Sequence, residues 1–176
     1  MNVEPVVLVL ASGRGERFIA SGGTGSKLKA LLAGKAVLEH TLDAVRASGL
    51  RWHVEDAGHE GMGDSIAAAV RATRDAAGWL VLPGDLPLVK PESLRRVAQA
   101  LRDDAIVVPF HRGLRGHPVA FGSSFGDALA ALTGAEGAAS IVLAHVPVTL
   151  ELDDAGIVTD IDTVEQLAAA QSLLKR

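Results

Sequence analysis

Short runs of apolar residues alternate along this chain with segments in which apolar residues recur every three or four positions. Three runs, at residues 6–10, 79–82 and 106–108, are apolar throughout. Strands covered on both faces of a parallel sheet have this unbroken pattern, whereas strands covered on one face alternate apolar and polar residues. We therefore expect buried strands in a mainly parallel sheet at these positions.

Helical periodicity occupies the intervals between the runs. Two sets of apolar residues have helical spacing, first Leu38, Leu42 and Val45, and then Leu94, Val97 and Leu101. Residues 145–150 are expected to form another strand and residues 163–174 a closing helix. Residues 116–122 are expected to form a small hairpin or antiparallel strand. This alternation predicts an α/β fold, a three-layer sandwich around a mostly parallel, Rossmann-like sheet.

The size and composition are those of an ordinary globular domain. The 176 residues contain no long linker or internal repeat, so we predict a single domain over 1–176. The net charge of −4 argues against a nucleic-acid partner. The absence of cysteine excludes disulfides and thiolate metal sites. Because no apolar run could span a bilayer and residues 1–5 carry no basic stretch, we expect neither membrane attachment nor a signal peptide, and a cytoplasmic location.

A glycine-rich segment, residues 11–27, follows the first strand. Glycines let backbone N–H groups approach an anion, and Arg17 and Lys27 would neutralise it. The segment is not a dinucleotide fingerprint, because Phe18 stands where the third glycine belongs, and it is not a Walker A loop, because Leu28 replaces the Ser or Thr. Either a long phosphate-binding loop or a flexible surface loop accounts for the pattern.

Two acidic motifs could hold a metal ion. Asp85 follows the strand at 79–82, and its carboxylate is a suitable ligand for Mg²⁺, although a turn aspartate would have the same surroundings. Asp160 and Asp162 precede the last helix. There, Thr163 with Gln166, or Asp162 with Glu165, would equally make an ordinary helix N-cap.

Two further motifs indicate a binding site less specifically. Residues 61–65 open an alanine-rich helix, and such a small-residue start can hold a base or ribose, or can be a closely packed turn. His117 begins the run at 118–121, and a lone histidine is more often structural than catalytic.

Taken in order, these motifs resemble those of the nucleotidyltransferases that build molybdenum cofactors, the MobA-like NTP transferases, and most closely the molybdenum cofactor cytidylyltransferase group. The resemblance rests on L-A-S-G-x-G-x-R at 10–17, K-L at 27–28, G-K-A-V-L at 34–38, the helix start at 61–69, G-D-L-P at 84–87, G-H-P-V at 116–119 and D-I-D-T at 160–163.

The resemblance implies an enzyme that moves CMP from CTP to a molybdopterin-type phosphate and releases pyrophosphate. The residues implied to bind the nucleotide are Leu10, Ala11, Ser12, Gly13, Gly15, Lys27, Gly63 and Ser65. Catalysis would involve Arg17, Lys27 and Asp85, Mg²⁺ would be held by Asp85 and Asp162, and His117 would face the acceptor. Besides CTP and the phosphorylated acceptor, the resemblance allows contact with a molybdoenzyme or its chaperone. It does not indicate an oligomeric state.

The chain departs from the family pattern in three places. Ser12 replaces an alanine. The first loop is longer than usual, with residues 19–26 before Lys27, and Lys29 lies close enough to compete for the role of Lys27. Residues 49–60 are too few for the strand–helix–strand passage of the family, so the sheet should be shortened by about one βα unit, leaving one strand at 51–55. That passage borders the base pocket in the family. Guanylyl transfer, sugar-phosphate nucleotidyl transfer and a non-catalytic nucleotide-binding relative therefore stay open.

Overall fold

The apolar run at residues 6–10 forms β1 (Val6–Leu10), a strand in which every residue is buried. The computed structural model describes residues 4–13 and 15–175 and places β1 between two parallel neighbours, β4 (Arg51–Glu55) and β5 (Gly78–Pro83). A strand flanked and covered in this way has no polar face, which explains its unbroken apolar sequence.

Within the described residues, seven strands form one sheet in the order β4-β1-β5-β8-β6-β7, and β9 pairs with β6. β8 (Val119–Gly122) is antiparallel to β5 and to β6 (Ile106–His111), and the short β7 (Leu114–Arg115) is also antiparallel to β6. β9 (Val148–Glu151) is parallel to β6. Only β7 and β8 therefore run against the other strands, and the predicted mostly parallel α/β fold with an antiparallel strand near 116–122 is confirmed.

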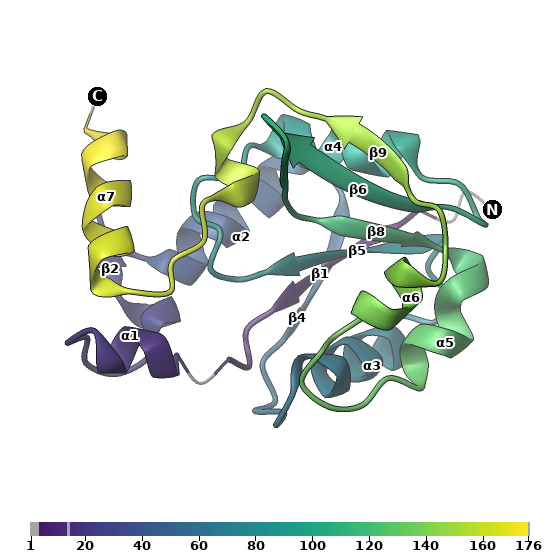
Figure 1. Ribbon diagram of the computed structural model, residues 1–176, viewed down its shortest axis with the longest axis horizontal. Coiled ribbons are helices and arrows are strands. Elements are labelled where there is room, and N and C mark those ends of the chain that lie inside the picture. The colour runs from purple at the N-terminus through teal and green to yellow at the C-terminus, as the bar shows by residue number, and fades with distance from the viewer. Residues whose placement is uncertain (1–3, 14, 176) are drawn as a thin grey trace.

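Helices cover both faces of the sheet (Figure 1). Side chains at positions 7 and 9 of β1 pack with residues of α2 (Val37–Ser48) and α4 (Pro91–Ala100). Those at positions 6, 8 and 10 pack toward α3 (Met62–Ala72), α5 (Gly126–Ala130) and α6 (Ala139–Leu143). The two faces of one apolar strand thus serve two separate cores, as a three-layer sandwich requires.

A third, smaller core lies beside the sheet, under α7 (Val164–Leu174), and includes Leu28, Leu32 and Ile161. Around it lie α1 (Glu16–Ala20), the 3-10 helix η1 (Lys27–Lys29) and a two-stranded hairpin of β2 (Leu31–Leu32) and β3 (Lys35–Ala36). Figure 1 shows α1, β2 and α7 grouped at one end of the molecule. The remaining short helices are η2 (Ser123–Phe125) and η3 (Ala155–Val158).

Two elements begin later in the chain than the sequence predicts. The strand expected at 145–150 begins only at Val148, because the His145 N–H still donates to the carbonyl of Val142 and continues the turn that ends α6. The closing helix begins at Val164, where Thr163 and Gln166 form the capping box that was one of the two alternatives for this motif.

Between α2 and α3 the chain forms a single strand, β4, which lies at one edge of the sheet. This agrees with the single strand expected at 51–55. No helix among residues 4–13 and 15–175 is long and apolar enough to cross a membrane. Residues 1–3, on which part of the signal-peptide expectation rests, lie outside the described residues.

Candidate active site

The loops that follow β1, β4 and β5 meet where the strands end, along the carboxyl edge of the sheet, because these three strands are parallel and end together. Ligands of open α/β sheets bind outside such carboxyl ends. The loop after β5 is tied to the loop after β1, since the Gly84 N–H donates to the Leu10 carbonyl at 2.9 Å. It is also tied to the segment before α7, since the Ile161 N–H donates to the Asp85 carbonyl at 2.9 Å.

Lys27 is the centre of the polar contacts at this edge. Its Nζ lies 2.8 Å from Asp85 Oδ2 and 2.7 Å from Asp162 Oδ1, and its side chain is only 14% exposed. Arg17 adds a contact of 3.0 Å to Asp162 Oδ2 and remains largely exposed to solvent. The two contacts of Lys27 therefore join residues that lie up to 135 positions apart in the sequence.

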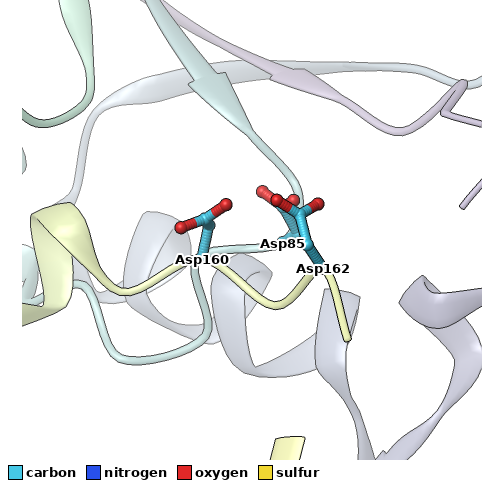
Figure 2. Close-up of side chains that lie close together, drawn as sticks. All are labelled: Asp85, Asp160 and Asp162. Atoms are coloured by element: carbon cyan, nitrogen blue, oxygen red, sulfur yellow. The ribbon is translucent and has the colours of Figure 1, made fainter. Parts of the chain in front are cut away.

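The acidic group contains three carboxylates. Oxygens of Asp85, Asp160 and Asp162 lie within 4.8 Å of one another. Figure 2 shows the three side chains extending to the same side of the backbone, Asp85 from the loop after β5 and the other two from the segment before α7. Asp160 and Asp162 are two positions apart, the spacing that places side chains on one side of an extended segment.

The charges in this group shift one another's pKa values. Burial, together with hydrogen bonding to and repulsion from Asp162, raises the pKa of Asp160 to about 6. Burial also acts to raise the pKa of Asp162, but its hydrogen bonds with Asp160 and Lys27 outweigh burial and lower it. For Lys27, burial acts to lower the pKa, and the two aspartates outweigh it and raise the pKa above its ordinary value.

This arrangement fits a divalent cation. Asp85 and Asp162 already direct oxygens at a single positive group, the Lys27 ammonium, and Asp160 supplies a third carboxylate within reach. Oxygen ligands are those that Mg²⁺ and Mn²⁺ prefer. Burial is the main cause of the raised pKa of Asp160, and the negative charges of Asp162 and Asp85, which a cation would offset, add to it.

A cavity of about 170 Å³ lies beside Lys27 and Asp85. Five of the eight residues predicted to bind the nucleotide line it, namely Leu10, Ser12, Gly13, Lys27 and Ser65. The other lining residues are Leu28, His59, Glu60, Gly61, Met62, Pro83, Gly84 and Asp85. The exposed surface of its walls is mainly apolar, as is usual for small-molecule pockets, although six of the lining residues carry polar or charged side chains.

The other three predicted nucleotide-binding residues lie elsewhere. Gly15 lines an adjoining cavity together with Arg17 and Lys27. Ala11 donates its N–H to the Glu55 carbonyl at 2.9 Å, at the junction of β1 and β4. Gly63 donates its N–H to the Gly134 carbonyl, and a Cβ on Gly63 would lie 2.8 Å from the Thr133 oxygen. Gly63 therefore allows close packing of the α3 start against the chain at 133–134 and does not line the first cavity.

His117 lines a further cavity of about 350 Å³ that also contains the three aspartates, Arg17 and Arg115. Its backbone is held in place because the His117 N–H donates to the Ile157 carbonyl at 3.0 Å. Its Nδ1 is buried and has no partner among the described residues. Burial lowers the pKa of the His117 imidazole, which is therefore neutral near pH 7.

A family model described as the MobA-like NTP transferase domain matches residues 44–148. The chain belongs to this family. The bifunctional protein GlmU of Xylella fastidiosa is 29% identical over 126 residues, which is 58% of this chain. The chain spans only 27% of the length of this GlmU.

Solved structures share the fold over nearly the whole chain. A nucleotidyl transferase from Methanothermobacter has a TM-score of 0.83 and 21% identity, with 100% of this chain and 99% of that chain covered. Rv0371c from Mycobacterium tuberculosis H37Rv has a TM-score of 0.81 and 24% identity, and the match covers 98% of this chain and 100% of Rv0371c. Rv0371c has also been crystallised in complex with manganese. That structure has a TM-score of 0.75 and 22% identity, and the match covers 96% of this chain and 98% of that chain.

Two residues of this MobA-like site were given no role by the family resemblance. Asp160 is in the acidic motif that the sequence offers, and the structure adds its carboxylate to those of Asp85 and Asp162. His59 lines the first cavity, and its neighbour Glu55 binds it. Nothing in the local sequence marks His59, because only the pairing of β4 with β1 brings the residues after Glu55 to this edge.

Proposed function

We propose that this MobA-like chain transfers a nucleoside monophosphate from an NTP to a phosphorylated acceptor and releases pyrophosphate. One observation carries the proposal: Lys27, Arg17 and three carboxylates converge at the carboxyl edge of the sheet, beside an apolar cavity. Fixed cations and a carboxylate cluster are the groups that phosphate chemistry requires, since its catalysis is mainly positioning and electrostatic stabilisation.

The nucleotide is proposed to lie across the end of β1. Its base and ribose would occupy the first cavity, against Leu10, Ser12, Gly13 and Ser65, and its triphosphate would extend toward Lys27 and Arg17. Gly15 would approach the phosphates with its backbone, because it lines the adjoining cavity with both cations. Gly63 would act indirectly, through the packing of the α3 start.

The divalent cation, for which we favour Mg²⁺, would be held by Asp85 and Asp162 with Asp160 beside them. When bound, it supplies positive charge to the phosphate oxygens. Lys27 would leave its aspartates to contact the triphosphate, and with Arg17 it would offset the charge that passes to pyrophosphate as the acceptor phosphate attacks the α-phosphorus in line.

The acceptor is proposed to occupy the cavity that contains His117. The neutral, buried imidazole is suited to hydrogen bonding with an uncharged part of the acceptor, such as a pterin ring. The motif resemblance supports a molybdopterin-type phosphate as acceptor and CTP as donor. Ser12, in place of a glycine expected for guanylyl transfer, also supports CTP.

A panel of NTPs tests this function. CTP, GTP, ATP and UTP would be titrated with Mg²⁺, and pyrophosphate release would be followed with molybdopterin and with a sugar 1-phosphate as acceptors. Release with CTP and molybdopterin is the expected result. Release only with the sugar phosphate would reassign the acceptor, and binding without release would identify a non-catalytic relative. Failure of all four nucleotides to bind would refute the proposal.

A further inference from the structure

A buried carboxylate with two histidine partners lies at the end of the edge strand. Glu55 closes β4, and its side chain is 11% exposed. Its Oε2 contacts His53 Nε2 at 3.0 Å, and its Oε1 contacts His59 Nε2 at 2.9 Å. Its backbone carbonyl also accepts from the Ala11 N–H and from Ser12 Oγ, so this group is joined to the loop after β1.

These contacts determine which imidazole nitrogen carries hydrogen. Burial acts to raise the pKa of Glu55, but the hydrogen bonds with His53 and His59 outweigh burial and lower it. An ionised carboxylate only accepts hydrogen bonds, so Nε2 of each histidine must be the donor. In the neutral imidazole the other nitrogen, Nδ1, then accepts. His59 Nδ1 has no hydrogen-bond partner within the described part of the chain.

His59, unlike His53, lines the first cavity. The order of the strands explains its position there, because β4 and β5 flank β1 on opposite sides. Asp85 follows β5 and holds the Lys27 ammonium at 2.8 Å, whereas His59 follows β4. Adjacent strands lie about 4.8 Å apart, so a nucleotide that crosses the end of β1 with its phosphates near Lys27 has its base near His59.

We propose that His59 is a specificity-determining residue for the nucleotide base, accepting through Nδ1 a hydrogen bond from an exocyclic amino group. Glu55 is its positioning residue. The inference rests on the proposed function, and it names the class of base that the cavity selects. Cytosine, adenine and guanine carry such an amino group and uracil does not. CTP and UTP differ mainly in this group and in the adjacent ring nitrogen, so they are the sharpest pair of probes.

The experiment compares the dissociation constants of CTP and UTP, each with Mg²⁺, for the wild type and three variants. His59→Gln keeps an amide N–H that can donate to Glu55, but its one acceptor, the carbonyl oxygen, is displaced from the position of Nδ1. His53→Gln makes the same exchange on the other side of Glu55 and is the matched control. His59→Asn provides a carbonyl oxygen near the position of Nδ1. Thermal melting of each variant monitors the fold.

We expect the wild type to prefer CTP over UTP, and His59→Gln to lower that preference about three- to tenfold, the effect of one hydrogen bond. His53→Gln should retain the preference and His59→Asn should retain part of it. Equal binding of CTP and UTP by the wild type, or an equal loss in His53→Gln and His59→Gln, would overturn the role of His59. Failure of every nucleotide to bind would instead overturn the proposed function, and the role of His59 with it.

Discussion

Replacing Lys27 by alanine should weaken NTP binding far more than replacing Lys29. In the present structure the Lys27 ammonium makes two short contacts, 2.8 Å to Asp85 and 2.7 Å to Asp162, from a side chain that is mostly buried. Lys29 is exposed, and no residue of the described chain forms an ion pair with it. Of these two lysines, only Lys27 lines the three cavities at this edge of the sheet.

The size of the effect follows from the contact that would be lost. One charge-assisted hydrogen bond to a phosphate contributes about 1.5–3 kcal/mol, which corresponds to roughly a ten- to hundredfold rise in the dissociation constant. The loss should fall near the upper end, because without Lys27 the three aspartates face the triphosphate with less compensating charge. Lys29→Ala should change the constant by less than about twofold, as expected for an exposed charge.

Isothermal titration of CTP with Mg²⁺, at one fixed ionic strength, measures both variants against the wild type. Thermal melting shows whether Lys27→Ala remains folded, since the loss of this residue also leaves Asp85 without its partner. A larger loss of affinity in Lys29→Ala than in Lys27→Ala would refute the assignment of Lys27 as the phosphate ligand.

Three further predictions follow from the site. Asp85→Asn should abolish turnover at every Mg²⁺ concentration while the melting temperature changes little, because Lys27 keeps Asp162 as a partner; wild-type turnover would make Asp85 a turn residue only. Gly63→Ala should destabilise the fold by about 1–3 kcal/mol in a denaturant titration, because its Cβ would press on the Thr133 carbonyl. Gly13→Ala, whose Cβ meets no atom within 4 Å, is the control, and equal stability of the two would exclude this close packing. CTP and GTP should bind within about tenfold of each other, because the passage at 49–60 contains only β4 and is expected to enclose the base less. A preference of several hundredfold for either nucleotide would show that another segment closes the pocket.

The sequence by itself determined the architecture. An unbroken apolar run such as residues 6–10 can be satisfied only where both faces are covered, so the pattern already implied helices on both sides of the sheet. The capping box at Thr163 and Gln166 was readable for the same reason, because a helix start depends on residues close together in the chain. Asp85 was also readable as a site candidate, since it directly follows a buried strand.

Only the tertiary structure decided which side chains meet. Lys27 and Asp162 are 135 positions apart, and no local pattern states that they lie 2.7 Å from each other. His59 enters the first cavity because β4 pairs with β1, and Gly63 is placed against Gly134 by the packing of α3. Local spacing specifies a strand or a helix because its hydrogen bonds are local. A site built from four separate loops depends on how the strands are ordered, and that order is a property of the packed sheet.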